Sequence, residues 1–162
     1  VACASNLRQI GAALHMYIDE HDFTFPPEIS YWASLSPYLN DSNVWNCPSY
    51  NQSAFDYVHM SYAYNVEGLN NYTNFGAVYG GKDINEIISP SQCIALADSG
   101  NYPSGQDVWA FELLAPSEQQ IGSRHSGGAN VLFVDGHVGW HRQDVIINAD
   151  RLTWWNERVY GE

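Results

Sequence analysis

The chain has 162 residues, and eighteen acidic residues against six basic ones give it a formal net charge of −12. This charge argues against nucleic acid and anionic lipid headgroups as partners. Three cysteines without a C-x-x-C pair are too few for a disulfide scaffold and do not indicate zinc, and no stretch is apolar enough to span a membrane.

The first twenty residues predict an amphipathic helix. Apolar side chains recur at spacings of three and four: Leu7, Ile10, Leu14, Tyr17 and Ile18. Of these we expect four to join the helix to a sheet: Leu7, Ile10, Leu14 and Ile18. The helix should end near Glu20, and Pro26-Pro27 bars any continuation. No capping residue precedes Val1, so we expect the natural helix to continue upstream.

The middle of the chain predicts short elements. Residues 32–39 favour a short helix, and the alternation over 57–65 predicts a strand with Tyr62 and Tyr64 on its packing face. Residues 67–82 are rich in Gly and Asn and predict a loop with little regular structure. A helical turn is expected at 84–88.

The next stretches favour strands. Cys93 to Ala97 is a short apolar run between turn residues, which predicts a buried strand, and residues 108–114 could form another. Near the C-terminus we expect a strand over 145–147 and a helix over 149–159 capped by Asn148.

Asp135-Gly136 predicts a hairpin with a two-residue type I′ turn. That register places four apolar side chains on one face: Val131, Phe133, Val138 and Trp140. One long helix followed by strands at moderate spacing predicts a single α+β domain over residues 1–162, with the helix laid across a mostly antiparallel sheet and irregular loops between.

Several motifs together resemble the bacterial prepilin-type, processing-associated family. His125 stands nine residues before Asp135-Gly136, which matches the H-x9-D-G motif of that family. Residues 3–17, CASNLRQIGAALHMY, are similar to the segment that follows the membrane helix in these proteins. Other motifs follow in the family's order: FPPE, WASLSPYL, CPS, SYAYN and ALADS.

This resemblance implies a type IV pilin-like or type II secretion pseudopilin-like protein. Residues 1–20 would then be the C-terminal half of a long helix whose hydrophobic upstream half anchors the precursor in the membrane. The expected location is extracytoplasmic, in the periplasm or at the cell surface. The expected partners are other pilin-like subunits and the pilus or secretion machinery, and the expected role is structural rather than enzymatic.

Cys3 and Cys47 have two interpretations. They are either two buried thiols or a disulfide that ties the helix to the loop before Pro48. In the chain-entropy picture such a bridge contributes roughly 3–4 kcal/mol, and it would suit an oxidising compartment. Cys93 is expected to be a buried apolar filler.

His125 and Asp135 have a structural and a metal interpretation. We favour structural braces that hydrogen-bond turns and strand ends, with Gly136 completing the turn. The alternative is a metal site built from Asp98, His125 and Asp135. His137 and His141 share a face of one strand, but their separation of about 13 Å is too large for one ion.

No cofactor is expected, although calcium is possible because similar pseudopilins hold it in a loop near the C-terminus. Candidate oxygen donors are Asp98, Asp107, Glu112 and Asp135. The chain lacks a G-x-S-x-G elbow and phosphate-binding glycine motifs, so a conventional enzyme is not expected.

Two alternative functions stay open. Exposed aromatic side chains could stack on sugars, as in an extracellular carbohydrate-binding module, and the candidates include four tryptophans: Trp109, Trp140, Trp154 and Trp155. The other alternative is a metal-dependent hydrolase that uses His125, Asp135 and Asp98.

Overall fold

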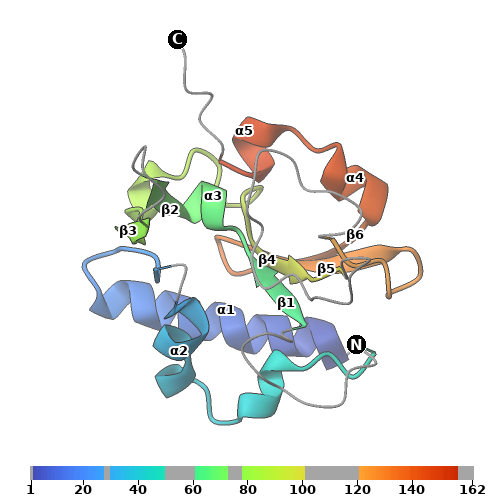
Figure 1. Cartoon of the computed structure of the whole chain (residues 1–162), viewed down its shortest axis with the longest axis horizontal. Coiled ribbons are helices and arrows are strands. Elements are labelled where there is room, and N and C mark those ends of the chain that lie inside the picture. Colours follow the sequence, from blue (N-terminus) through green and yellow to red (C-terminus); the bar gives the residue numbers. More distant parts are fainter. Residues whose placement is uncertain (1, 28–29, 50–60, 73–77, 101–120, 157–162) are drawn as a thin grey trace.

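A computed structural model describes residues 2–27, 30–49, 61–72, 78–100 and 121–156 (Figure 1). The helices are α1 (Ala2–Glu20), α2 (Tyr31–Leu35), α3 (Val66–Leu69), α4 (Gln143–Ile147) and α5 (Arg151–Trp154), and short 3-10 turns cover Ser36–Tyr38, Ser42–Trp45 and Ile84–Glu86. The strands are β1 (Tyr62–Tyr64), β2 (Asn70–Tyr72), β3 (Val78–Gly81), β4 (Ile94–Asp98), β5 (Gly128–Phe133) and β6 (Val138–Arg142).

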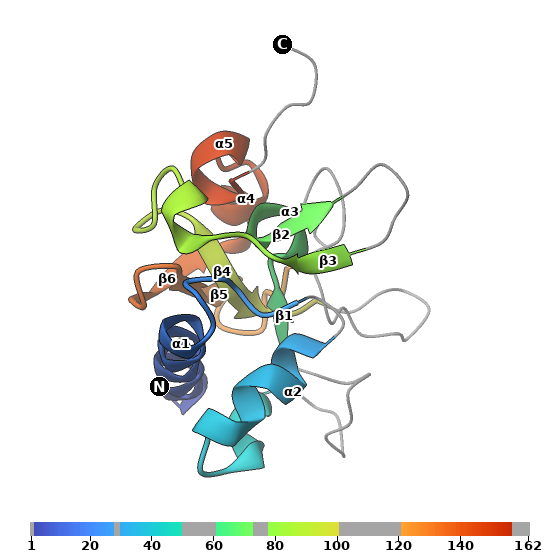
Figure 2. The same cartoon turned by 90° about the vertical axis from the view of Figure 1, so that its left-hand side faces the viewer.

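The main sheet has four antiparallel strands in the order β1-β4-β5-β6, and β2 and β3 form a second, two-stranded sheet. Helix α1 lies along one face of the main sheet, and α4 and α5 lie on the other (Figures 1 and 2). The prediction of a mixed α+β fold with an N-terminal helix and an antiparallel sheet is confirmed. The sequence predicted a C-terminal helix, but not that helices cover the second face of the sheet.

Helix α1 packs through the predicted stripe. Leu7, Ile10, Leu14 and Ile18 are at most 1% exposed and belong to one core cluster with Leu96 and Leu132 of the sheet. The helix lies close to the sheet at Gly11, where a Cβ atom would come within 2.7 Å of the Leu132 side chain.

Helix α1 ends before the two prolines. The chain reverses at Asp22 and Phe23, which have φ values of 50° and 59°, and the Phe23 N–H donates to the Ile18 carbonyl at 3.0 Å. This left-handed C-terminal turn satisfies a carbonyl of the last helical turn. The helix therefore stops without needing Pro26 and Pro27.

The β5–β6 hairpin has a register one residue away from the predicted one. Val131 pairs with Gly139 and Leu132 with Val138, and three residues, 134–136, form the loop. A type I′ turn needs positive φ at both central residues. Gly136 has a φ of +90°, but Asp135 does not enter the left-handed region, so the prediction of this turn type is wrong. The Gly136 N–H donates to the Phe133 carbonyl at 2.9 Å, as in a turn closed by a bulge.

This register shift changes which side chains share a face. Val131 and Phe133 pack with Ile146 on the α4 side of the sheet, whereas Val138 packs on the α1 side with Leu132. The cause is tertiary, because the Val134 N–H donates to the Cys93 carbonyl at 2.9 Å and the Asp135 N–H donates to the Pro90 carbonyl at 3.2 Å.

We expect Gly136→Ala to lower the free energy of unfolding by about 1–2 kcal/mol, the cost of a left-handed backbone at a residue with a Cβ atom. The new Cβ would also lie 3.2 Å from His15 Nε2. Urea denaturation measures the change. An unchanged free energy of unfolding in Gly136→Ala would contradict the left-handed backbone at this position.

The Gly- and Asn-rich segment forms strands, and β1, which precedes it, packs as predicted. The loop prediction for 67–82 is wrong where the segment is described, because β2 and β3 pair there and α3 ends at Leu69. In β1, Tyr62 and Tyr64 do pack on the α1 side, while residues 57–60 and 108–114 lie outside the described residues.

The C-terminal elements also differ. Residues 145–147 belong to helix α4 rather than to a strand, and Asn148 ends that helix. Helix α5 begins at Arg151, where the Asp150 carboxylate accepts the Thr153 N–H at 2.8 Å. Two short helices therefore stand where a strand and a longer helix were predicted, and residues 157–159 of the predicted helix lie outside the described residues.

Candidate functional site

A polar cluster lies on the α1 side of the sheet near the start of α1, and we call it the Asp98 cluster: Asp98, Arg124, His125, Asn130, Cys3 and Cys47. Asp98 ends β4 and lies beside Asn130 of β5, because Ala97 pairs with Val131. Arg124 and His125 come from the turn before β5. The strand pairing therefore brings together residues that are far apart in sequence.

The structure joins Cys3 to Cys47 by a disulfide with a Cα–Cα separation of 5.0 Å. Of the two interpretations of these cysteines, the structure has the bridge. Both residues are nearly fully buried, and Cys3 belongs to the first turn of α1. The bridge closes a span of 44 residues, for which chain entropy gives a stabilisation of about 4 kcal/mol.

Asp98 is a fully buried carboxylate. Its Oδ2 accepts two hydrogen bonds from Asn130, one from the backbone N–H at 2.6 Å and one from Nδ2 at 2.9 Å. Within the described residues Oδ1 accepts no hydrogen bond, but it lies 3.7 Å from Nε of Arg124. The guanidinium, which also donates to the Ser61 carbonyl at 2.7 Å, offsets the cost of burying this charge.

His125 lies between the carboxylate and the disulfide. Its Nε2 is 3.3 Å from Asp98 Oδ2 and 3.4 Å from Cys47 Sγ. Its backbone pairs in both directions with Gly128 at 3.2 Å across a tight turn in which Ser126 and Gly127 have positive φ. Trp140 Nε1 donates to the His125 carbonyl at 2.8 Å. These backbone bonds and the bond from the Trp140 indole to the carbonyl fix the backbone of His125, and with it the position of the imidazole.

Asp135 lies at the opposite end of β5. Its Oδ1 lies 2.6 Å from Nδ1 of His137 and accepts the His137 N–H at 3.1 Å, so it braces the hairpin tip. At about 3.3 Å per residue, β5 separates Asp135 from the His125 turn by about 20 Å. The metal set of Asp98, His125 and Asp135 is therefore not assembled; only Asp98 and His125 meet.

The candidate calcium donors that the structure describes do not lie together either. Asp98 ends β4 beside Asn130, whereas Asp135 lies in the loop after β5, and Asp107 and Glu112 lie outside the described residues. Among the described residues, one group of three metal-binding side chains lies together: Cys3, Cys47 and His125. The sequence does not predict this group, since the cysteine spacing carries no zinc signature.

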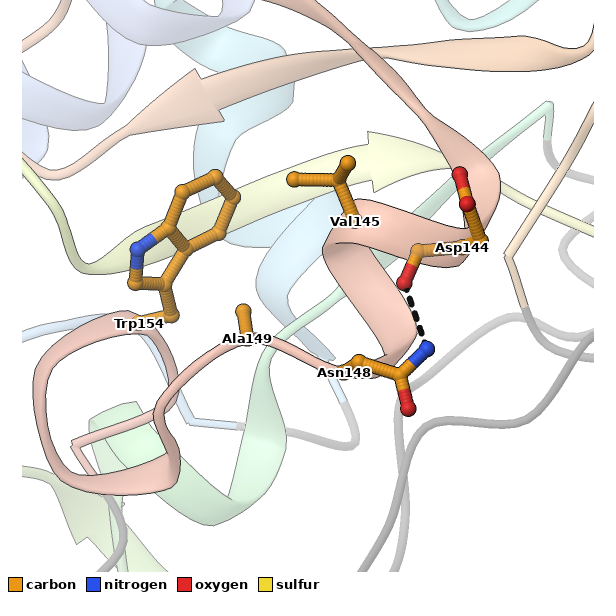
Figure 3. A pocket seen from close by; sticks show the side chains of 5 residues that line it. All are labelled: Asp144, Val145, Asn148, Ala149 and Trp154. Carbon is orange, nitrogen blue, oxygen red and sulfur yellow. Dashed lines mark hydrogen bonds between the residues drawn. The ribbon is translucent and has the colours of Figure 1, made fainter.

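A hollow of about 430 Å³ lies on the opposite side of the sheet, between α4 and α5 (Figure 3). Trp154 forms one side, and Asp144, Val145, Asn148 and Ala149 form the rest. Asn148 Nδ2 donates to the Asp144 carbonyl at 2.7 Å, the bond drawn in Figure 3. The hollow combines an indole with amide and carboxylate groups.

Trp154 is held by two edge-to-face ring contacts, with Phe133 at 5.6 Å and His141 at 5.1 Å. The other tryptophans named as sugar-stacking candidates differ: Trp140 is about half exposed, Trp155 is buried, and Trp109 lies outside the described residues. Burial, and secondarily the nearby charge of His137, lower the pKa of His141.

We expect the lowered pKa of His141 to make stability fall as the pH drops below its ordinary value of about 6.5. As the pH falls, His141 is protonated in the unfolded chain before it is protonated in the folded chain, so acid favours unfolding. At higher pH the imidazole is neutral in both states and this loss of stability disappears. His141→Gln should flatten this part of the curve of urea midpoint against pH. An unchanged slope in the variant would contradict the assignment.

No helix among the described residues has the length and apolar character needed to cross a membrane. No family model, no curated protein and no solved structure matches this chain. The class that the described residues define is therefore a mixed α+β domain with an N-terminal helix packed on an antiparallel sheet.

Proposed function

We propose that this chain is the head domain of a pilin-like or pseudopilin-like subunit, which acts by assembling into a pilus-like or type II secretion filament. The observation that carries the proposal is that α1 has one buried face and one exposed face. One stripe of the helix is buried against the sheet, while Arg8, Ala12 and Met16 face outward. In such a filament the outward face of the helix would contact neighbouring subunits.

The disulfide supports this role. It fixes the first turn of α1 to the segment that follows the Ser42–Trp45 turn, so that a force along the helix is transmitted to the head. Structural disulfides are typical of extracytoplasmic proteins, which agrees with a periplasmic or surface location. In the precursor, an apolar helix upstream of Val1 would provide the membrane anchor.

The exposed face of α1 provides a direct test in the organism that carries the gene. Met16→Glu places a charge on the face proposed to contact other subunits, where the side chain is 50% exposed in the isolated domain. We expect the purified variant domain to keep its stability, and the full-length variant to be absent from sheared surface filaments on immunoblots.

Ile88→Glu is the matched control, because Ile88 is 55% exposed and lies outside α1. It should enter filaments as the parent does. Normal incorporation of Met16→Glu, or absence of the parent protein from any filament, would overturn the proposal.

A second candidate function is glycan binding, and the hollow beside Trp154 favours it. A rigidly held indole next to Asn148 and Asp144 offers a stacking surface and polar groups, the usual combination for a sugar ring. A glycan array followed by titration of Trp154→Ala tests it. We expect the variant to lose any binding seen; an array without hits removes this candidate.

A further inference from the structure

We propose that reduction of the Cys3–Cys47 disulfide converts the Asp98 cluster into a metal site, in which both thiolates and Nε2 of His125 bind one Zn²⁺ ion. This inference does not depend on the proposed filament role. It starts from the three donor atoms, Sγ of each cysteine and a ring nitrogen of His125, which all lie within 4.8 Å of one another.

Two distances to His125 Nε2 match a tetrahedral site, whereas the two sulfurs, 2.05 Å apart in the disulfide, would separate to about 3.8 Å once the bond is broken. With Zn–S near 2.3 Å and Zn–N near 2.0–2.1 Å, the edge between a sulfur and a nitrogen is about 3.5 Å. Cys47 Sγ and His125 Nε2 are already 3.4 Å apart. Asp98 Oδ2 is 3.3 Å from the same nitrogen, close to the nitrogen–oxygen edge of about 3.3 Å, which makes this carboxylate the nearest fourth donor.

Hydrogen bonds hold the chain segments of the two cysteines together without the covalent bond. Asn6 Nδ2, one turn after Cys3, donates to the Asn46 carbonyl at 2.8 Å, next to Cys47. The Cys47 N–H donates to Ser61 Oγ at 2.8 Å, which ties this segment to the residue before β1. Breaking the disulfide therefore leaves two thiols facing each other in a buried and supported pocket.

The charges balance in the filled site. A dithiol or phosphine reductant supplies two electrons and is itself oxidised, and the two cysteines take up two protons. Zn²⁺ then displaces both thiol protons, and the neutral imidazole binds through the Nε2 lone pair with its proton on Nδ1. Zinc with two thiolates is neutral, and Arg124 already neutralises Asp98, so no net charge enters the interior.

The test compares the oxidised chain with the chain reduced by a phosphine, which leaves no competing thiol in solution. Co²⁺ serves as the spectroscopic probe, since thiolate coordination gives a charge-transfer band in the near ultraviolet. Zn²⁺ is titrated against a coloured chelator. We expect one equivalent of each metal to bind to the reduced chain, and none to bind to the oxidised chain at this site.

His125→Gln should weaken Zn²⁺ binding by more than about tenfold, since loss of even an outer partner of a ligand costs that much. His137→Gln is the matched control, because His137 is half exposed at the far end of β5, and it should bind as the parent does. Urea denaturation of the oxidised His125→Gln chain shows whether the variant keeps its fold.

Three results would overturn the proposal. The first is a reduced chain that binds neither metal, and the second is equal binding by the His125→Gln and parent chains. The third is loss of folded structure on reduction, monitored by circular dichroism, because the argument requires the hydrogen bonds around Cys47 to hold the thiols together.

Discussion

Replacing Asp98 with alanine is expected to lower the free energy of unfolding by about 3–5 kcal/mol, because breaking a buried ion pair by removing one partner is strongly destabilising. Arg124, whose side chain is only 13% exposed, loses the carboxylate oxygen that lies 3.7 Å from its Nε. The backbone N–H of Asn130 also loses an acceptor at 2.6 Å. Urea denaturation at pH 7 measures the loss.

Asp144→Ala is the matched control for Asp98→Ala. Asp144 also pairs with an arginine, and its oxygens lie 2.7 and 3.0 Å from Arg142, but both side chains are more than half exposed. Exposed ion pairs contribute at most about 1 kcal/mol. Equal effects of the two substitutions would contradict the structural role assigned to the buried carboxylate.

Leu14→Ala is expected to lower the free energy of unfolding by about 2–5 kcal/mol, the cost of deleting a buried side chain and leaving a cavity. Leu14 is 1% exposed and lies in the α1 side of the core. For a domain of this size the change corresponds to a fall in Tm of roughly 4 °C or more. Differential scanning calorimetry measures it.

Met16→Ala, two residues along the same helix, provides the control. Its side chain is 50% exposed, so the change in stability should stay within about 0.5 kcal/mol. A Tm for Leu14→Ala within a degree of the parent would mean that the stripe does not attach the helix to the sheet.

The elements that the sequence predicts well are those whose side chains alternate between core and solvent or stay buried throughout. Helix α1 follows from its apolar stripe, and β4 follows from a short apolar run that is buried at every position. In both cases burial of side chains decides the structure, and burial leaves a periodic pattern in the sequence.

The hairpin register could not be predicted in the same way. Asp135-Gly136 is compatible with a two-residue turn and with a three-residue turn closed by glycine. The choice is made by backbone bonds from Val134 to Cys93 and from Asp135 to Pro90, which connect distant parts of the chain. Such bonds leave no trace in local composition.

The pairing of β2 with β3 has a similar cause. The Lys82 N–H donates to the Leu69 carbonyl at 2.9 Å, and the Phe25 N–H donates to the Lys82 carbonyl at 3.0 Å. These backbone bonds hold the ends of the β2–β3 pair in place, although Gly and Asn residues by themselves favour loops. A Gly- and Asn-rich composition therefore gave the wrong prediction for this segment.

The candidate site could be predicted only in part. His125 and Asp98 were named, but their meeting depends on the alignment of β4 with β5, and Arg124 was missed although it directly precedes the motif histidine. The separation of Asp135 from His125 could have been foreseen, because the strand between them has a fixed rise per residue. The partner of Cys3 depends on the position of the Ser42–Trp45 turn, which cysteine spacing does not encode.

The proposed filament role depends most on α1 being the lower part of a longer apolar helix. Sequencing the reading frame upstream of Val1 tests this directly. We predict a run of about twenty apolar residues preceded by a short basic leader, the length needed to cross a bilayer. A polar upstream sequence, or a start codon immediately before Val1, would contradict the account.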